Sequence, residues 1–173
     1  MIEIQKWFSE LQRIIDEPYP ASCAEPTGSM RSDKLETHLL ATPRRKTILF
    51  IDRSGDFEYD EEMTVEMEVK FAVEIDHCYA LLCQRMIEVY GPALNLQIQE
   101  LDLQVRTEPE DDSDDQALTN SYLSGASYDN SDDGDESFWQ IGTDFVCIQK
   151  IKNWGDGNFQ HNVIATVTPR ETV

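Results

Sequence analysis

The feature that most constrains the fold of this chain is an alternating stretch from Met63 to Ile75, MTVEMEVKFAVEI. Its apolar positions are Val65, Met67, Val69, Phe71, Val73 and Ile75. Charged residues fill most of the positions between them. A period of two over this length predicts a β-strand with one face in a core and one face in water. On the wet face, Glu66, Glu68 and Glu74 would project on one side, with successive positions about 6–7 Å apart.

The period changes directly after this stretch. From Asp76 to Tyr90 the apolar residues recur at helical spacing, and they include Tyr79, Leu82, Met86 and Val89. Asp76 is placed to cap the first turn. Gly91 supplies a left-handed residue after the helix, and Pro92 prevents its continuation. The pattern predicts a helix whose apolar stripe packs on the sheet.

The N-terminal part predicts a second main helix. Apolar residues from Ile4 to Ile15 recur at helical spacing, and Pro18 ends the pattern. The segment from Arg31 to Ala41 is ambiguous. Asp33 and Glu36 resemble a capping box, which fits a short helix that ends before Pro43.

A basic cluster, Arg44 to Lys46, leads into a stretch rich in β-forming residues. We expect the three cations to be solvated at the sheet edge. Thr47 to Asp52 predicts a strand, and Ser54-Gly55 predicts a turn after it.

The remaining strands are predicted in the second half of the chain. Leu94 to Val105 has a period of two with a one-residue slip, which favours a β-bulge at Gln99-Glu100. The C-terminal part predicts strands at Phe138–Gly142, Asp144–Ile151 and Phe159–Thr168, with turns at Gly142-Thr143 and Asp156-Gly157.

Between these strands lies a segment of different composition, residues 108–136. It holds eleven acidic residues and no Lys or Arg. Such a segment buries too little apolar surface to offset its ordering entropy, so we expect a flexible acidic insertion. Asp129 to Ser137 partly matches a calcium loop of the EF-hand type, but Gln140 stands where a bidentate Glu belongs. A calcium-responsive module is therefore an alternative function.

Net charge constrains the partners. A formal charge of −20 on 173 residues argues against nucleic acid and anionic membranes as partners, because both are polyanions. The chain has no secretory signal pattern and no apolar run long enough to span a bilayer, so we expect a cytoplasmic protein. Its four scattered cysteines predict free thiols and no metal site. Oligomeric state is left open.

No catalytic motif occurs, so we predict no enzyme, no catalytic residues and no cofactor. The sequence predicts a single α+β domain over residues 1–173. Its mostly antiparallel sheet of about five or six strands would carry two main helices on one face, with residues 108–136 as the insertion.

The predicted function is a small acidic protein that occupies the basic surface of a partner protein, as an inhibitor, an immunity protein or a nucleic-acid mimic. An adaptor that binds an apolar peptide segment, as secretion chaperones do, is a further alternative. The predicted partner-binding residues are Asp60, Glu61, Glu62, Glu66, Glu68, Glu74, Asp111, Asp112, Asp114 and Asp115.

Overall fold

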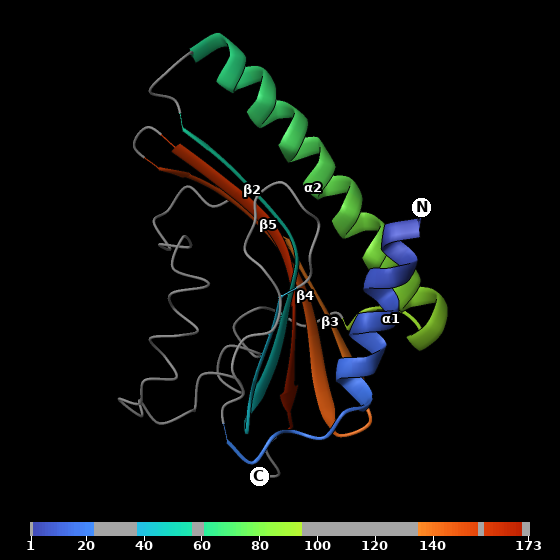
Figure 1. Cartoon of the computed structure of the whole chain (residues 1–173). Helices are drawn as coiled ribbons and strands as arrows, with labels where there is room; N and C mark the ends of the chain where they lie inside the picture. Colours follow the sequence, from blue (N-terminus) through green and yellow to red (C-terminus); the bar gives the residue numbers. More distant parts are fainter. Residues whose placement is uncertain (1, 23–37, 57–60, 95–134, 156–157, 171–173) are drawn as a thin grey trace.

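The computed structural model describes residues 2–22, 38–56, 61–94, 135–155 and 158–170. The elements in chain order are α1 (Ile2–Asp16), β1 (His38–Thr42), β2 (Arg45–Asp56), α2 (Glu61–Tyr90), β3 (Asp135–Ile141), β4 (Asp144–Gly155) and β5 (Asn158–Pro169). The five strands form one antiparallel sheet in the order β1-β2-β5-β4-β3. Both helices lie on the same side of the sheet (Figure 1). The predicted α+β class is confirmed.

The strand predicted from Met63 to Ile75 is wrong, because α2 begins at Glu61 and includes all of it. The reason is that the stretch carries two helical rows of apolar residues. Val65, Val69 and Val73 form one row, and Met67, Phe71 and Ile75 form the other. Residues four apart share a helix face, and an offset of two residues turns a side chain by about 200°, to the opposite face. Two opposite rows therefore imitate the period of a strand.

For the helix predicted from Asp76 to Tyr90, the end is confirmed and the start is wrong. The amide of Gly91, with φ of 86°, donates to the carbonyl oxygen of Ile87 at 2.9 Å, as a helix-ending glycine does. Asp76 lies in the middle of α2 and caps nothing. The N-terminal helix is confirmed as α1, with one to two more residues at each end.

The predicted strands between Phe138 and Thr168 are confirmed as β3, β4 and β5, and Gly142 takes a positive φ of 61° in the β3–β4 turn. The short helix predicted before Pro43 is wrong for the residues that the structure describes there, because His38–Thr42 is strand β1. The predicted strand Leu94–Val105 lies outside the described residues, apart from Leu94. So does the predicted insertion, apart from Asp135 and Glu136, which belong to β3.

A hydrophobic core lies between the sheet and the two helices. The apolar stripe of α1 is core, as its spacing predicts, and it buries Trp7, Phe8, Leu11 and Ile14. The ring of Trp7 lies 5.8 Å from that of Phe50 in β2. From α2, the core takes Ile75, Cys78, Leu82 and Met86. These four residues lie in the second half of α2 or border it, so the core lies under that half.

The turn predicted at Ser54-Gly55 is wrong, because both residues continue β2 and pair with Gln160 and Phe159 of β5. Gly55 is required by packing instead. A Cβ atom added there would lie 2.5 Å from the Phe159 ring and 2.9 Å from the methyl carbon of Met67. The missing side chain lets Met67 and Phe159 pack over the strand.

We predict that Gly55→Val destabilises the protein by about 1–3 kcal/mol, because a side chain at this position forces Phe159 and Met67 to shift. Urea unfolding measures the change. Ser54→Val is the matched control: Ser54 is the neighbouring residue in β2, but its side chain is exposed. Equal stability of the two variants would contradict the packing role of Gly55.

Candidate functional site on helix α2

The sheet face beneath the helices changes from apolar to basic along its strands. In β4, Val146 and Ile148 belong to the core, whereas Lys150 and Lys152 bind a carboxylate of α2. In β5 the change occurs between Val163 and His161. Three acidic residues of α2 face these groups. We call this set the polar layer; it comprises Arg53, Lys150, Lys152 and His161 of the sheet and Glu68, Glu74 and Asp76 of α2.

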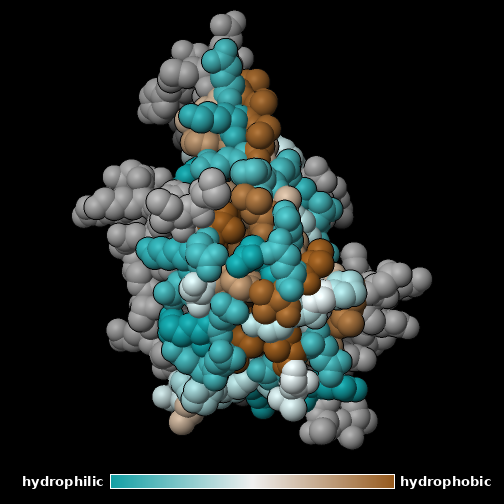
Figure 2. All heavy atoms as spheres, turned by 90° about the vertical axis from the view of Figure 1, so that its right-hand side faces the viewer, coloured by the Kyte–Doolittle hydropathy of each residue, from teal (hydrophilic) through white to brown (hydrophobic). Residues whose placement is uncertain are grey.

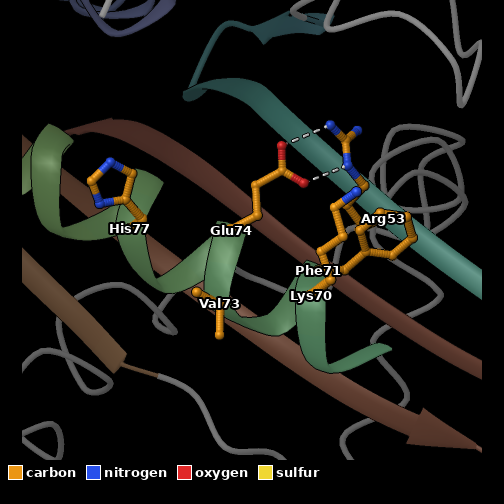
Figure 3. Close-up of a pocket in the computed structure, with 6 residues that line it drawn as sticks. All are labelled: Arg53, Lys70, Phe71, Val73, Glu74 and His77. Atoms are coloured by element: carbon orange, nitrogen blue, oxygen red, sulfur yellow. Dashed lines mark hydrogen bonds and ion pairs between the residues drawn. The ribbon is translucent and has the colours of Figure 1, made fainter. Parts of the chain in front are cut away.

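The first contact of the polar layer joins Arg53 of β2 to Glu74. Arg53 donates from Nε and Nη2 to the two carboxylate oxygens, at 3.0 and 3.1 Å. The guanidinium carbon also lies 5.6 Å from the centre of the Phe71 ring. Figure 3 shows this pair at an open hollow between α2 and β2, which Lys70, Val73 and His77 also line. Because Glu74 already binds the guanidinium twice, the hollow offers no free arginine fork for an anion.

The second contact is a carboxylate between two lysines. Asp76 accepts hydrogen bonds from Nζ of Lys150 at 2.6 Å and from Nζ of Lys152 at 2.7 Å. Lys150 also lies 2.9 Å from a carboxylate oxygen of Asp135. Desolvation raises the pKa of Asp76, but the hydrogen bonds from both lysines together lower it below its ordinary value. The pKa of Lys150 is lowered by desolvation and raised more by its bonds to Asp135 and Asp76, so its net shift is upward.

The third contact holds a buried histidine. His161 is fully buried, and its Nε2 lies 2.8 Å from Oε1 of Glu68. Trp154 donates from its indole nitrogen to the same oxygen at 3.2 Å. The Trp154 and Phe159 rings each lie 5.1 Å from the imidazole. The other ring nitrogen, Nδ1, has no hydrogen-bond partner. The described contacts of this imidazole are therefore one carboxylate, that of Glu68, and two aromatic rings.

The structure separates the predicted partner-binding residues. Glu68 and Glu74 bind His161 and Arg53, whereas Glu66 is exposed on α2. The three therefore do not form one carboxylate strip, and that part of the prediction is wrong because the segment is a helix. Glu61 and Glu62 belong to the first turn of α2. The remaining predicted residues lie outside the described ranges: Asp60, Asp111, Asp112, Asp114 and Asp115.

Several cations are buried or only partly exposed in the fold, which their positions in the sequence did not lead us to predict. Lys46, predicted to be solvated, is 2% exposed; its Nζ donates to the carbonyl oxygen of Glu17 at 2.6 Å and lies 4.4 Å from the centre of the Tyr19 ring. Desolvation lowers its pKa, although nearby carboxylates oppose the shift. A signal was present in β4. Lys150 and Lys152 stand at alternate positions of the face that carries Val146 and Ile148.

The outer face of α2 is apolar where a solvated helix is normally polar. Val65, Val69 and Val73 are 52%, 55% and 63% exposed. We call these three residues the valine stripe. Figure 2 views the side of the molecule that the helices cover, and it shows apolar side chains among hydrophilic ones on this face. The stripe lies on the side of α2 opposite the row of Met67, Phe71 and Ile75, and it borders Asp76 of the polar layer, which follows Val69 by seven residues.

The described residues give little support for thiol or metal chemistry. Cys78, Cys83 and Cys147 are reduced thiols that form no disulfide, as predicted for these three positions. Burial raises the pKa of Cys83 and Cys147, which makes both thiols poor nucleophiles. No group of three or more metal-ligating side chains occurs among the residues that the structure describes. Of the partial calcium pattern, Ser137 lies in β3, with its hydroxyl 2.8 Å from that of Tyr79; positions 129–134 lie outside the described ranges.

Within the described ranges, neither helix has the length and apolar character needed to cross a membrane. Comparison with known proteins found no matching family model, no matching curated protein and no matching solved structure. We therefore infer the function from the surface and charge of this chain alone.

Proposed function

We propose that this chain is a small, non-enzymatic acidic protein that binds the basic surface of a partner protein, in the manner of an inhibitor, an immunity protein or a nucleic-acid mimic. The observation that carries the proposal is how the fold distributes its charge. The chain has 34 acidic and 14 basic residues. Two of the basic side chains, Lys46 and Lys152, are buried, and two more, Arg53 and Lys150, are only partly exposed. Because the sequence has twenty more acidic than basic residues, the chain keeps a large excess of carboxylates after the ion pairs of Arg53, Lys150 and Lys152 have formed.

A strongly acidic protein affects mainly the rate at which a basic partner approaches, before the two are in contact. An excess of one sign of charge attracts a partner of the opposite sign over a distance set by screening, about 8 Å at physiological ionic strength. It raises the association rate more than it slows dissociation. Like charge also repels nucleic acids and anionic membranes, so the same property selects the class of partner.

The test begins with a pull-down from the native cell extract, washed at low and at high salt, with identification of the proteins that elute. We expect a basic protein that is retained at low salt and released at high salt. Association kinetics with that protein are then measured over a range of salt concentrations. We expect the association rate to fall steeply as salt rises.

Charge variants locate the surface. Glu68 and Glu74 are unsuitable, because their removal would break the contacts to His161 and Arg53. The variant Asp111/Asp112/Asp114/Asp115→Asn removes four charges from the predicted insertion, and we expect slower association and a shallower salt dependence. The same four positions changed to Glu keep the charge and serve as the control. Equal, salt-independent binding by all three proteins would contradict the proposal.

One observation favours a second candidate function, an adaptor that binds an apolar peptide segment. The valine stripe offers such a segment an exposed apolar face. Binding through this face alone would be nearly independent of salt, because burial of apolar surface is not screened. The salt series therefore distinguishes the two functions.

A further inference from the structure

Beyond the valine stripe, the same side of α2 carries Asp76, seven residues after Val69, and then two further apolar residues. Ala80 is exposed and lies seven residues after Val73, and Ile87, seven residues further on, is 48% exposed. A spacing of four or seven residues keeps side chains near one face of a helix. From Val65 to Ile87 the row extends over about 33 Å. This length and spacing suit contact with another helix.

The fold itself does not need these valines. The opposite row, with Met67, Phe71 and Ile75, packs toward the sheet; Phe71 lies 6.2 Å from the Phe159 ring. Valine is less favourable than alanine in a helix by roughly 0.5 kcal/mol, because its branched Cβ loses rotamer freedom. At more than half exposure the valines recover little of this by burial. Neither helix propensity nor burial within the fold therefore explains their position.

The charge of the chain identifies the kind of occupant. Residues 61–76 of α2 carry six acidic residues and one lysine, and three of the six, Glu68, Glu74 and Asp76, already bind basic groups of the sheet. Exposed Glu66 lies in sequence between Val65 and Val69. A second copy of the chain would bring a charge of −20 against −20. It would also gain only a few exposed apolar side chains, whereas a stable interface buries roughly 800 Å² on each partner. Both facts disfavour a dimer, and the net charge favours an occupant with positive charge.

We propose that the outer face of α2 is a docking site for an amphipathic helix of a basic partner protein. The apolar face of that helix lies along Val65, Val69 and Val73 and extends toward Ile87, and its Lys and Arg side chains lie beside the carboxylates of α2. This inference rests on the proposed function and names the part of the partner that is recognised. In this proposal the negative charge of the chain attracts the partner, and the valine stripe orients the partner's helix.

The test uses a synthetic peptide as the probe. It consists of three heptads of Leu, Ala and Lys, with the apolar residues on one helical face, and a scrambled peptide of the same composition is the control for charge. Binding to the full chain is measured by fluorescence anisotropy at about physiological ionic strength. We expect the amphipathic peptide to bind at least tenfold more tightly than the scrambled one.

Two protein variants place the site. Val65/Val69/Val73→Thr keeps the shape of the exposed side chains and the net charge, and we expect at least a tenfold loss of affinity for the amphipathic peptide. Val89→Thr is the control, because Val89 is 47% exposed on α2 but lies outside the row. We expect its affinity to match that of the parent chain. Circular dichroism confirms that both variants keep the fold.

Three results would overturn the inference. Equal binding of the scrambled peptide would show that charge alone is recognised, and unchanged affinity of the triple variant would place the site elsewhere. Sedimentation that shows a dimer of the parent chain, lost in the triple variant, would make a second copy the occupant. The first two results leave the proposed function intact if the salt dependence of partner binding stays steep.

Discussion

Replacing Leu82 with alanine is expected to lower the free energy of unfolding by about 2–5 kcal/mol. Leu82 has no exposed surface and lies in the core on the inner face of α2. The truncation removes buried methyl groups and leaves a cavity, because the surrounding side chains close only part of the space. Urea unfolding of the variant and the parent measures the difference.

The control for this substitution lies on the same helix. Ile87 is 48% exposed, so Ile87→Ala should change stability by less than about 0.5 kcal/mol. The two variants remove groups of similar size from opposite sides of α2. A cost below about 0.5 kcal/mol for Leu82→Ala would contradict the packing described for this helix.

Replacing Asp76 with asparagine is expected to destabilise the protein by about 1–3 kcal/mol at neutral pH, since the substitution removes the carboxylate that two poorly exposed lysines share. Lys152 then loses its described acidic partner, whereas Lys150 keeps Asp135. Glu66→Gln is the matched control, because it removes one carboxylate from an exposed position of the same helix. Equal stability of the two variants would contradict the role of the polar layer.

The same substitution should change the response to acid. The pKa of Asp76 is lower in the folded chain than its ordinary value of 3.8. Its ion pairs therefore contribute stability that is fully present above pH 3.8 and is lost as the pH falls through the lower, folded value. Unfolding measured between neutral pH and acid should show this loss in the parent and not in Asp76→Asn. Parallel curves for the two proteins would contradict the assignment.

Sequence patterns predicted most of the regular structure where each element carries a single periodic signal. In α1, one stripe from Trp7 to Ile14 faces one core, so spacing and burial agree. The end of α2 was also predictable, because Gly91 and Pro92 act locally on the backbone. The hairpin from β4 to β5 follows from β-forming residues on either side of Asp156-Gly157.

The candidate site was predictable only in part. Glu66, Glu68 and Glu74 were selected for their charge, and all three lie in α2, where the polar layer and the valine stripe meet. Their different environments follow from partners that are distant in the sequence: Arg53 for Glu74, and His161 for Glu68. No local pattern specifies such pairs, since they form only when β2 and β5 lie together under the helix.

By itself, the sequence determined the α+β class, the acidity of the chain, α1 and the end of α2, because these depend on composition and on single local patterns. Only the tertiary structure decided that residues 63–75 are helical. Periodicity records that apolar residues recur, but it does not record which of them a core will cover. Once the sheet covers Met67, Phe71 and Ile75, the remaining row, Val65, Val69 and Val73, faces outward.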